Sequence, residues 1–167
     1  MPGLLTRLGG LWRFERVRTG RELADWLAGR AAFVSQKSTI GFCRSRLGLG
    51  WDRLQGEPAF AAAMERCRWE AYAAVLIDLA ELAQVVLRRG GQEAAATAER
   101  LLPVASAALL RHPVPRHRDS WTDVLALLAD RLEQALTLPP RPVHVVGAGA
   151  AARIVEVLPI RTDLQAQ

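Results

Sequence analysis

Residues 58–89 read PAFAAAMERCRWEAYAAVLIDLAELAQVVLRR, and this stretch decides the fold that the sequence predicts. Its apolar side chains recur at helical spacing over roughly eight turns. Pro58 suits a first helical turn, and Arg88, Arg89 and Gly90 are typical of a helix end. We therefore expect one long helix, Pro58–Arg89, with one face in the core. That face comprises Phe60, Met64, Cys67, Ala71, Val75, Leu82 and Val86.

A second helix is predicted before the long one. Thr19 and Glu22 form the T-x-x-E pattern of a capping box, in which each side chain accepts a hydrogen bond from a free backbone N–H. Apolar residues then follow at helical spacing as far as Leu47. Residues 48–56, GLGWDRLQG, are expected to form a loop because of their glycine content.

Two more helices are predicted after the long one. Residues 92–111 are rich in alanine and leucine. Residues 121–136 follow the N-cap pattern of Ser120 and Asp123 and end before two prolines. Four helices with short connections favour a helical bundle over residues 19–138.

The sequence after residue 138 has a different character. Val143–Val146 and residues 154–158 are rich in β-branched side chains and flank the sequence GAGAAA, so two short strands, paired as a hairpin, are predicted. GAGAAA also matches the G-x-G-x-x-A turn that binds dinucleotides, but too few residues follow to complete a βαβ unit. The predicted fold is thus mainly α, a four-helix bundle with a small C-terminal β-hairpin or strand pair over 139–167, without a cofactor.

Composition narrows the class of protein. The chain has 167 residues, of which 50% are hydrophobic and 23% are charged, so we expect a single domain with its own hydrophobic core.

Arginines interrupt every apolar run near the N-terminus, which excludes a secretory signal and favours the cytoplasm. Cys43 and Cys67 match no zinc-site spacing and are interpreted as core residues, with a disulfide left open.

No catalytic motif is complete in this sequence. No serine lies in the G-x-S-x-G pattern of a nucleophile elbow. His112, His117 and His144 fall in segments expected to be loops or strand edges, and we interpret them as exposed residues rather than metal ligands.

Asp78 is the acidic residue of the long helix that is predicted to face the core. At 100° per residue it falls within the apolar stripe, whereas Glu70 and Glu81 fall toward its edge. A buried carboxylate must find a partner or become neutral. A structural ion pair is the first interpretation, and a role in ligand binding is the second.

The predicted second helix carries cations and no acidic residue between Asp25 and Asp52. Arg30, Lys37 and Arg44 are spaced by seven, so they form a ridge on one helix face. This ridge could supply the partner of Asp78, bind an anion or a partner, or simply be solvated.

The N-terminal arm, residues 1–18, mixes large apolar side chains with arginines. Such a segment could lie in the interface of an anionic membrane, cap the open end of the bundle, or contact a protein partner. The residues assigned to this contact are Leu8, Leu11, Trp12, Arg13, Phe14 and Arg16.

Three segments carry a resemblance to a known family. They are AAFVSQKSTIGFCRSRLG (31–48), EPAF (57–60) and RCRWEAYAAVLIDL (66–79). Together they resemble a family of uncharacterised small alphaproteobacterial helical proteins, some of which are labelled esterases. The resemblance implies a shared helical core and supplies no mechanism.

These observations lead to one functional hypothesis and one alternative. The first is a non-catalytic accessory or adaptor protein that binds another protein, in the cytoplasm or at the surface of the cytoplasmic membrane; a homo-oligomer stays open. Nucleic acid is not expected as a partner, because no recognition motif accompanies the basic residues. The alternative is a small helical enzyme or ligand-binding protein, esterase-like, whose pocket joins Asp78 to Arg30, Lys37 and Arg44.

Overall fold

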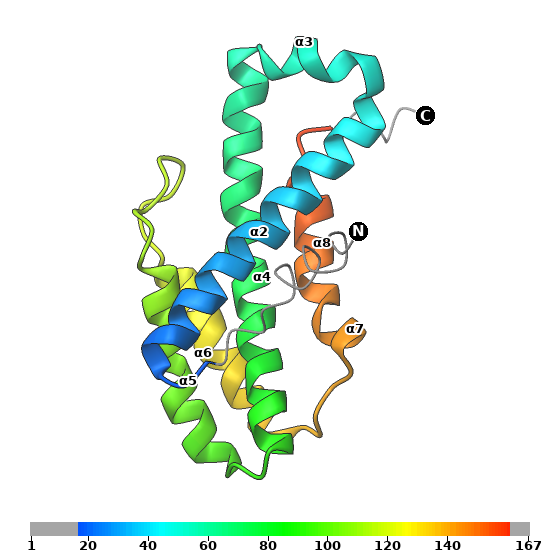
Figure 1. Cartoon of the computed structure of the whole chain (residues 1–167). Coiled ribbons are helices and arrows are strands. Elements are labelled where there is room, and N and C mark those ends of the chain that lie inside the picture. Colours follow the sequence, from blue (N-terminus) through cyan, green and yellow to red (C-terminus); the bar gives the residue numbers. More distant parts are fainter. Residues whose placement is uncertain (1–16, 161–167) are drawn as a thin grey trace, which may run out of the picture.

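The computed structural model describes residues 17–160, and all regular elements in that range are helices (Figure 1). In chain order they are α2 (Gly20–Leu47), the 3₁₀ helix η1 (Gly48–Gly50), α3 (Trp51–Gln55), α4 (Pro58–Arg89), α5 (Ala94–Leu109), α6 (Thr122–Thr137), α7 (Val143–Val146) and α8 (Ala148–Val157).

Helix α4 is the centre of the arrangement. It contacts α2, α5, α6 and α8, and α2 and α6 also pack on α5. Helices α2 and α4 run in opposite directions and are joined through α3 at one end of the molecule, while α8 lies along α4 on the opposite side from α5 (Figure 1). The prediction of a mainly helical fold is confirmed, but the four predicted helices are joined by α8, which packs on α4 as a further helix.

Local sequence signals set the ends of the two longest helices. The Thr19 hydroxyl accepts a hydrogen bond from the Glu22 N–H at 3.1 Å, and the Glu22 carboxylate accepts one from the Thr19 N–H at 3.2 Å, so the predicted capping box is formed. Helix α4 begins at Pro58 and ends at Arg89, as predicted. Because both signals act within a few residues, the sequence was enough to locate them.

Two segments differ from the prediction. Residues 48–56, which were expected to form a loop, are largely helical, because Trp51 buries its ring in the core. The ring contacts that of Phe60 edge to face, and the two ring centroids lie 6.0 Å apart. The predicted C-terminal β-hairpin is wrong: the described residues contain no strand, Val143–Val146 is α7, and the second predicted strand lies in α8 and just after it. Packing against α4 outweighs the β preference of the branched side chains.

The GAGAAA sequence is explained by close packing rather than by a turn between strands. Its residues lie at the start of α8, against α4. A Cβ atom at Gly149 would lie 3.0 Å from Nη2 of Arg131 and 3.3 Å from Oδ1 of Asp78. The absence of a side chain at residue 149 therefore lets α8 approach the Asp78 carboxylate.

Cys43 and Cys67 lie in an apolar cluster that is separate from the main core and is formed by α2, α3, α4 and the end of the described chain. Both are fully buried and unbridged, and the Cys43 thiol donates to Sδ of Met64 at 3.7 Å. Burial raises the pKa of the Cys43 thiol to about 11 and that of Cys67 to about 12. The prediction that they are core residues is confirmed, and thiols with such pKa values are poor nucleophiles at neutral pH.

Candidate functional site

Three carboxylates on α4 are buried. Asp78 is 5% exposed, which confirms the prediction that it faces the core. Glu70 and Glu81, which we expected at the edge of the apolar stripe, are 5% and 1% exposed. The expectation for these two was wrong because α6, α8 and the segments before them also cover the sides of α4.

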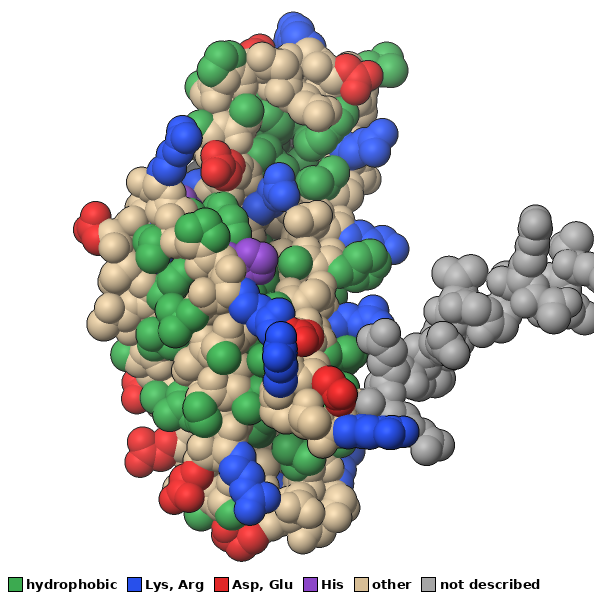
Figure 2. Space-filling view, turned by 60° about the vertical axis from the view of Figure 1, so that its left-hand side comes forward, with side chains coloured by type: hydrophobic (Ala, Val, Ile, Leu, Met, Phe, Trp, Pro, Cys, Tyr) green, Lys and Arg blue, Asp and Glu red, His purple; other side chains and the backbone are tan. Residues whose placement is uncertain are grey.

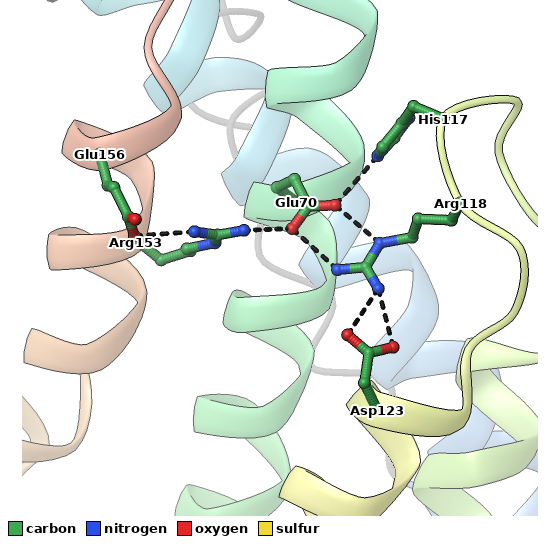
Figure 3. A network of polar contacts seen from close by, with 6 residues as sticks. All are labelled: Glu70, His117, Arg118, Asp123, Arg153 and Glu156. Carbon is green, nitrogen blue, oxygen red and sulfur yellow. Dashed lines mark hydrogen bonds and ion pairs between the residues drawn. The ribbon is translucent and has the colours of Figure 1, made fainter.

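Glu70 is the centre of a network of ion pairs that joins α4 to α8 and to the segment before α6 (Figure 3). Its two carboxylate oxygens accept hydrogen bonds from Nε and Nη2 of Arg118 at 2.6 and 2.8 Å, and Arg153 donates to one of them at 2.6 Å. Nε2 of His117 also forms a hydrogen bond with Oε1 of Glu70, at 2.9 Å. Burial alone would raise the pKa of Glu70, but the hydrogen bonds from these three residues outweigh it and lower the pKa to about 2.

Asp78 joins α4 to two other helices. Its Oδ2 accepts a hydrogen bond from the backbone N–H of Ala150 in the first turn of α8 at 2.9 Å, and Nη2 of Arg131, on α6, donates to Oδ1 at 3.2 Å. Burial raises the pKa of Asp78, and the Ala150 N–H and Arg131 only partly oppose that rise. The two oxygens of Asp78 therefore hold α6 and the start of α8 against α4.

Glu81 holds the segment that leads into α7. Arg141 donates to its carboxylate through Nε at 2.8 Å and Nη2 at 2.5 Å, and Nε of Arg131 lies 3.5 Å from the same group. Glu70, Asp78 and Glu81 thus bind, in this order, Arg153, Ala150 and Arg141. The partners occur in the opposite order in the chain, because α8 runs antiparallel to α4 (Figure 1). We call these three attachments the α4 clamp.

The Asp78→Ala variant should lose about 2 kcal/mol of unfolding free energy, because the buried Ala150 N–H is left without an acceptor. Asp78→Asn keeps an acceptor oxygen for the Ala150 N–H and should stay within about 1 kcal/mol of the wild type, since the hydrogen bond to α8 is retained. Urea unfolding of both variants at pH 7 measures this. Equal losses of unfolding free energy in the two variants would show that Asp78 stabilises the fold through its charge rather than through the hydrogen bond to Ala150.

A hollow of about 350 Å³ lies beside Asp78, between α4, α6 and α8. Its walls include Arg118, Arg131 and Arg153, and Leu127 is exposed at its rim. None of its described lining residues belongs to α2. Asp78 and the predicted ridge on α2 are therefore not brought together in one pocket.

The ridge of Arg30, Lys37 and Arg44 is exposed along the outside of α2. The expectation that it pairs with Asp78 was wrong, because the cation that reaches Asp78 comes from α6. None of the three ridge cations forms an ion pair with a described residue. Among residues 17–160 the ridge is thus a row of exposed cations without an ion-pair partner.

Two of the ridge cations lie over aromatic rings of the same helix. The Arg30 guanidinium lies 5.9 Å from the centroid of the Trp26 ring, and Nζ of Lys37 lies 5.6 Å from that of Phe33. Phe33 is 56% exposed. In Figure 2 blue side chains follow one another along the right-hand edge of the molecule, with green ones between them. We call Trp26, Arg30, Phe33, Lys37 and Arg44 the α2 outer face.

The histidines were only partly understood from the sequence. His117 is an exposed loop residue, as expected, but its side chain is 21% exposed and binds Glu70, which was not expected. The ring of His112 lies 5.4 Å from that of Trp69 and 5.1 Å from that of Tyr72. Neither contact has a local sequence signal, because the partners lie on a distant helix. His144 is exposed on α7, not at a strand edge.

The described residues offer no metal site and no membrane span. Within 17–160, no group of three or more His, Cys, Asp or Glu side chains could hold a metal ion. No helix in that range is long and apolar enough to cross a bilayer. The predicted membrane or partner contact of the N-terminal arm falls on residues 8–16, outside the described range, and stays a prediction.

Comparison with known proteins adds no assignment to this geometry. No family model, curated protein or solved structure matches the chain.

Proposed function

We propose that this protein is a non-catalytic adaptor that binds an acidic surface of a partner protein through the α2 outer face. The observation that carries the proposal is a row of three exposed cations, without an ion-pair partner among the described residues, around an exposed phenylalanine. Arginine and aromatic side chains are the residues that most often dominate binding energy at protein interfaces.

The contrast with α4 supports this assignment. The buried carboxylates of α4 are paired with cations from later segments, and these pairs hold the fold together. Arg30, Lys37 and Arg44 form no such ion pair with any residue in the described range. A surface with unpaired charge of one sign steers a complementary partner toward it and favours one orientation of the complex.

The alternative of a pocket that joins Asp78 to the ridge is less well supported. The hollow beside Asp78 has no α2 residue in its lining, and the Asp78 carboxylate already accepts two hydrogen bonds within the chain. An adaptor role uses the ridge where the structure has it, on the outside.

Charge reversal tests the proposal. Proteins captured by the full-length chain from a lysate of its source are identified, and the best-enriched partner is purified. The Arg30→Glu, Lys37→Glu, Arg44→Glu variant should bind this partner about tenfold more weakly than the wild type, since like charges would face each other. Added salt should weaken wild-type binding in the same direction.

A matched variant removes the effect of net charge alone. Arg89, Arg100 and Arg116 are exposed arginines outside α2, and replacing all three with Glu changes the net charge by the same amount. This control should bind like the wild type. Equal weakening in both variants, or none in the ridge variant, would refute the assignment of the α2 outer face.

A further inference from the structure

A hollow of about 450 Å³ lies between α2 and α4, beside the segment that follows α5. Three aromatic rings line it, those of Trp69, Tyr72 and His112, together with the charged side chains of Glu65 and Arg68. None of its described lining residues belongs to the α2 outer face or to the Glu70 network. An apolar hollow of this size with a few polar groups is typical of small-molecule sites. We call it the aromatic hollow.

The planes of the three rings are steeply inclined to one another. The rings of Trp69 and Tyr72 meet at 84°, and their centroids are 5.9 Å apart. The ring of His112 meets that of Tyr72 at 88° and that of Trp69 at 63°, with centroids 5.1 and 5.4 Å apart. Three rings in this arrangement can form the corner of a box, which is the form of the aromatic cages that bind methylated ammonium groups.

The fold holds the base of the aromatic hollow in place and leaves the space beside it open. Tyr72 is 2% exposed, and its hydroxyl donates a hydrogen bond to the backbone oxygen of Ala108 at 3.0 Å. On the α2 side, the lining includes the small side chains of Ala32 and Ser35. The rings are therefore positioned before a ligand binds, which lowers the entropic cost of binding.

Two opposite charges lie at the mouth of the aromatic hollow without pairing. Glu65 and Arg68 are exposed and are three residues apart on α4. Within residues 17–160, neither forms an ion pair with the other or with a third group. Residues three apart on a helix have Cβ atoms about 5–6 Å apart. One small molecule that carries both charges can therefore reach both side chains.

We infer that the aromatic hollow binds a small zwitterion whose cation is a trimethylammonium group. The three rings receive this cation, and the Glu65 carboxylate lies near it. The Arg68 guanidinium binds the carboxylate or phosphate of the same ligand. The site is separate from the α2 outer face, so the inference does not rest on the proposed function.

The lining favours a methylated cation over a primary ammonium group. A primary ammonium group has three N–H donors, and each needs an acceptor. A trimethylammonium group has no N–H and is stabilised by the faces of aromatic rings. Rings and small side chains make up most of the described lining of the aromatic hollow, and Glu65 is its one carboxylate.

Matched ligands test each part of the site on the full-length protein. Glycine betaine carries a trimethylammonium group and a carboxylate. Its carbon analogue, 3,3-dimethylbutanoate, has the same shape without the positive charge, and choline has the cation without the carboxylate. Isothermal titration calorimetry at pH 7 and low salt measures the three dissociation constants.

Glycine betaine should bind about tenfold more tightly than 3,3-dimethylbutanoate, since only a cation is attracted to the ring faces. Equal binding of these two compounds would overturn the inference. So would the lack of saturable binding by any of the trimethylammonium compounds.

Single substitutions separate the two charges of the site. Arg68→Gln should weaken glycine betaine about tenfold without weakening choline, because choline has no anion for Arg68 to bind. Glu65→Gln should weaken both ligands, since both carry the cation. Arg66→Gln, at an exposed α4 position outside the hollow, removes the same charge and should bind both like the wild type. Equal effects of the Arg66 and Arg68 variants would overturn the inference.

Filling the hollow tests its location without changing a charge. Ala61 lines the hollow, and its neighbour Ala62 is exposed outside it. Ala61→Phe should remove the binding of glycine betaine, and Ala62→Phe should bind it like the wild type. Circular dichroism shows whether both variants fold, and the Arg68→Gln result decides if Ala61→Phe does not. Unchanged binding by a folded Ala61→Phe would overturn the inference.

The same chemistry occurs in a soluble zwitterion and in the headgroup of phosphatidylcholine. Sedimentation of the protein with phosphatidylcholine vesicles, reversed by free phosphocholine, would identify the headgroup as the source. Binding of glycine betaine or phosphocholine without sedimentation would identify a soluble compound. The Arg30→Glu, Lys37→Glu, Arg44→Glu variant should bind glycine betaine like the wild type, because the α2 outer face takes no part in this site.

Discussion

Replacing Glu70 with glutamine is expected to lower the free energy of unfolding by about 3 kcal/mol at pH 7. Glu70 is 5% exposed and neutralises two guanidinium groups, those of Arg118 and Arg153, while it also accepts a hydrogen bond from His117. Removing its charge leaves Arg118 with Asp123 and Arg153 with Glu156 as counterions, and both of these carboxylates are exposed (Figure 3). Breaking one side of a buried ion pair costs more than the pair contributes, because the remaining charge stays desolvated.

Glu65→Gln is the matched control for this variant. Glu65 lies on the same helix, is exposed, and has no ion pair among the described residues. Its replacement should change the unfolding free energy by less than about 0.5 kcal/mol. Urea unfolding at pH 7 compares the two variants. Similar small losses in both would show that the Glu70 network contributes little to stability.

Acid should remove the same contribution from the wild-type protein. The pKa of Glu70 is lowered from 4.5 to about 2 in the folded state, so the unfolded chain takes up its proton first as the pH falls. The stabilisation by Glu70 is therefore complete above pH 4.5 and is lost as the pH falls toward about 2. The span of the shift corresponds to about 3 kcal/mol, which agrees with the expected loss in the glutamine variant.

Asp78 acts in the opposite direction. Burial raises its folded-state pKa, so the folded chain takes up this proton before the unfolded chain does, and the unfavourable contribution of the ionised group is lost as the pH falls toward 3.8. The two carboxylates of one helix therefore have opposing pH dependences. The difference between wild type and Glu70→Gln cancels the contribution of Asp78 and isolates that of Glu70.

Unfolding free energies of the wild type and Glu70→Gln, measured at intervals from pH 7 to pH 2, test this directly. The difference should be about 3 kcal/mol above pH 5 and should become small near pH 2, where Glu70 is protonated in the unfolded chain and about half protonated in the folded one. A difference that stays constant over this range would mean that the variant acts through packing rather than through charge.

The sequence by itself determined where the two longest helices begin and end and that Asp78 is buried. These features depend on groups that are close in the chain or related by helix periodicity. Thr19 and Glu22 form their capping box within one turn, and Pro58 and Gly90 act on their own backbone. The heptad spacing of the α2 ridge was visible for the same reason, although its exposure was not.

Only the tertiary structure decided which groups surround the acids of α4. Arg118 lies 48 residues after Glu70, and Arg153 lies 83 residues after it. No local pattern could pair them, and a single helical wheel could not show that Arg153 of α8 reaches Glu70 or that Arg141 reaches Glu81.

The same reason explains the error in the C-terminal segment. Its β-branched residues favour strands when they are considered alone. In the folded chain, the Asp78 carboxylate binds the N–H of Ala150, and the missing side chain at Gly149 lets a helix approach α4. Intrinsic preferences differ by about 1 kcal/mol or less per residue, and the contacts that α4 provides, which form only when the distant segments meet, outweigh them.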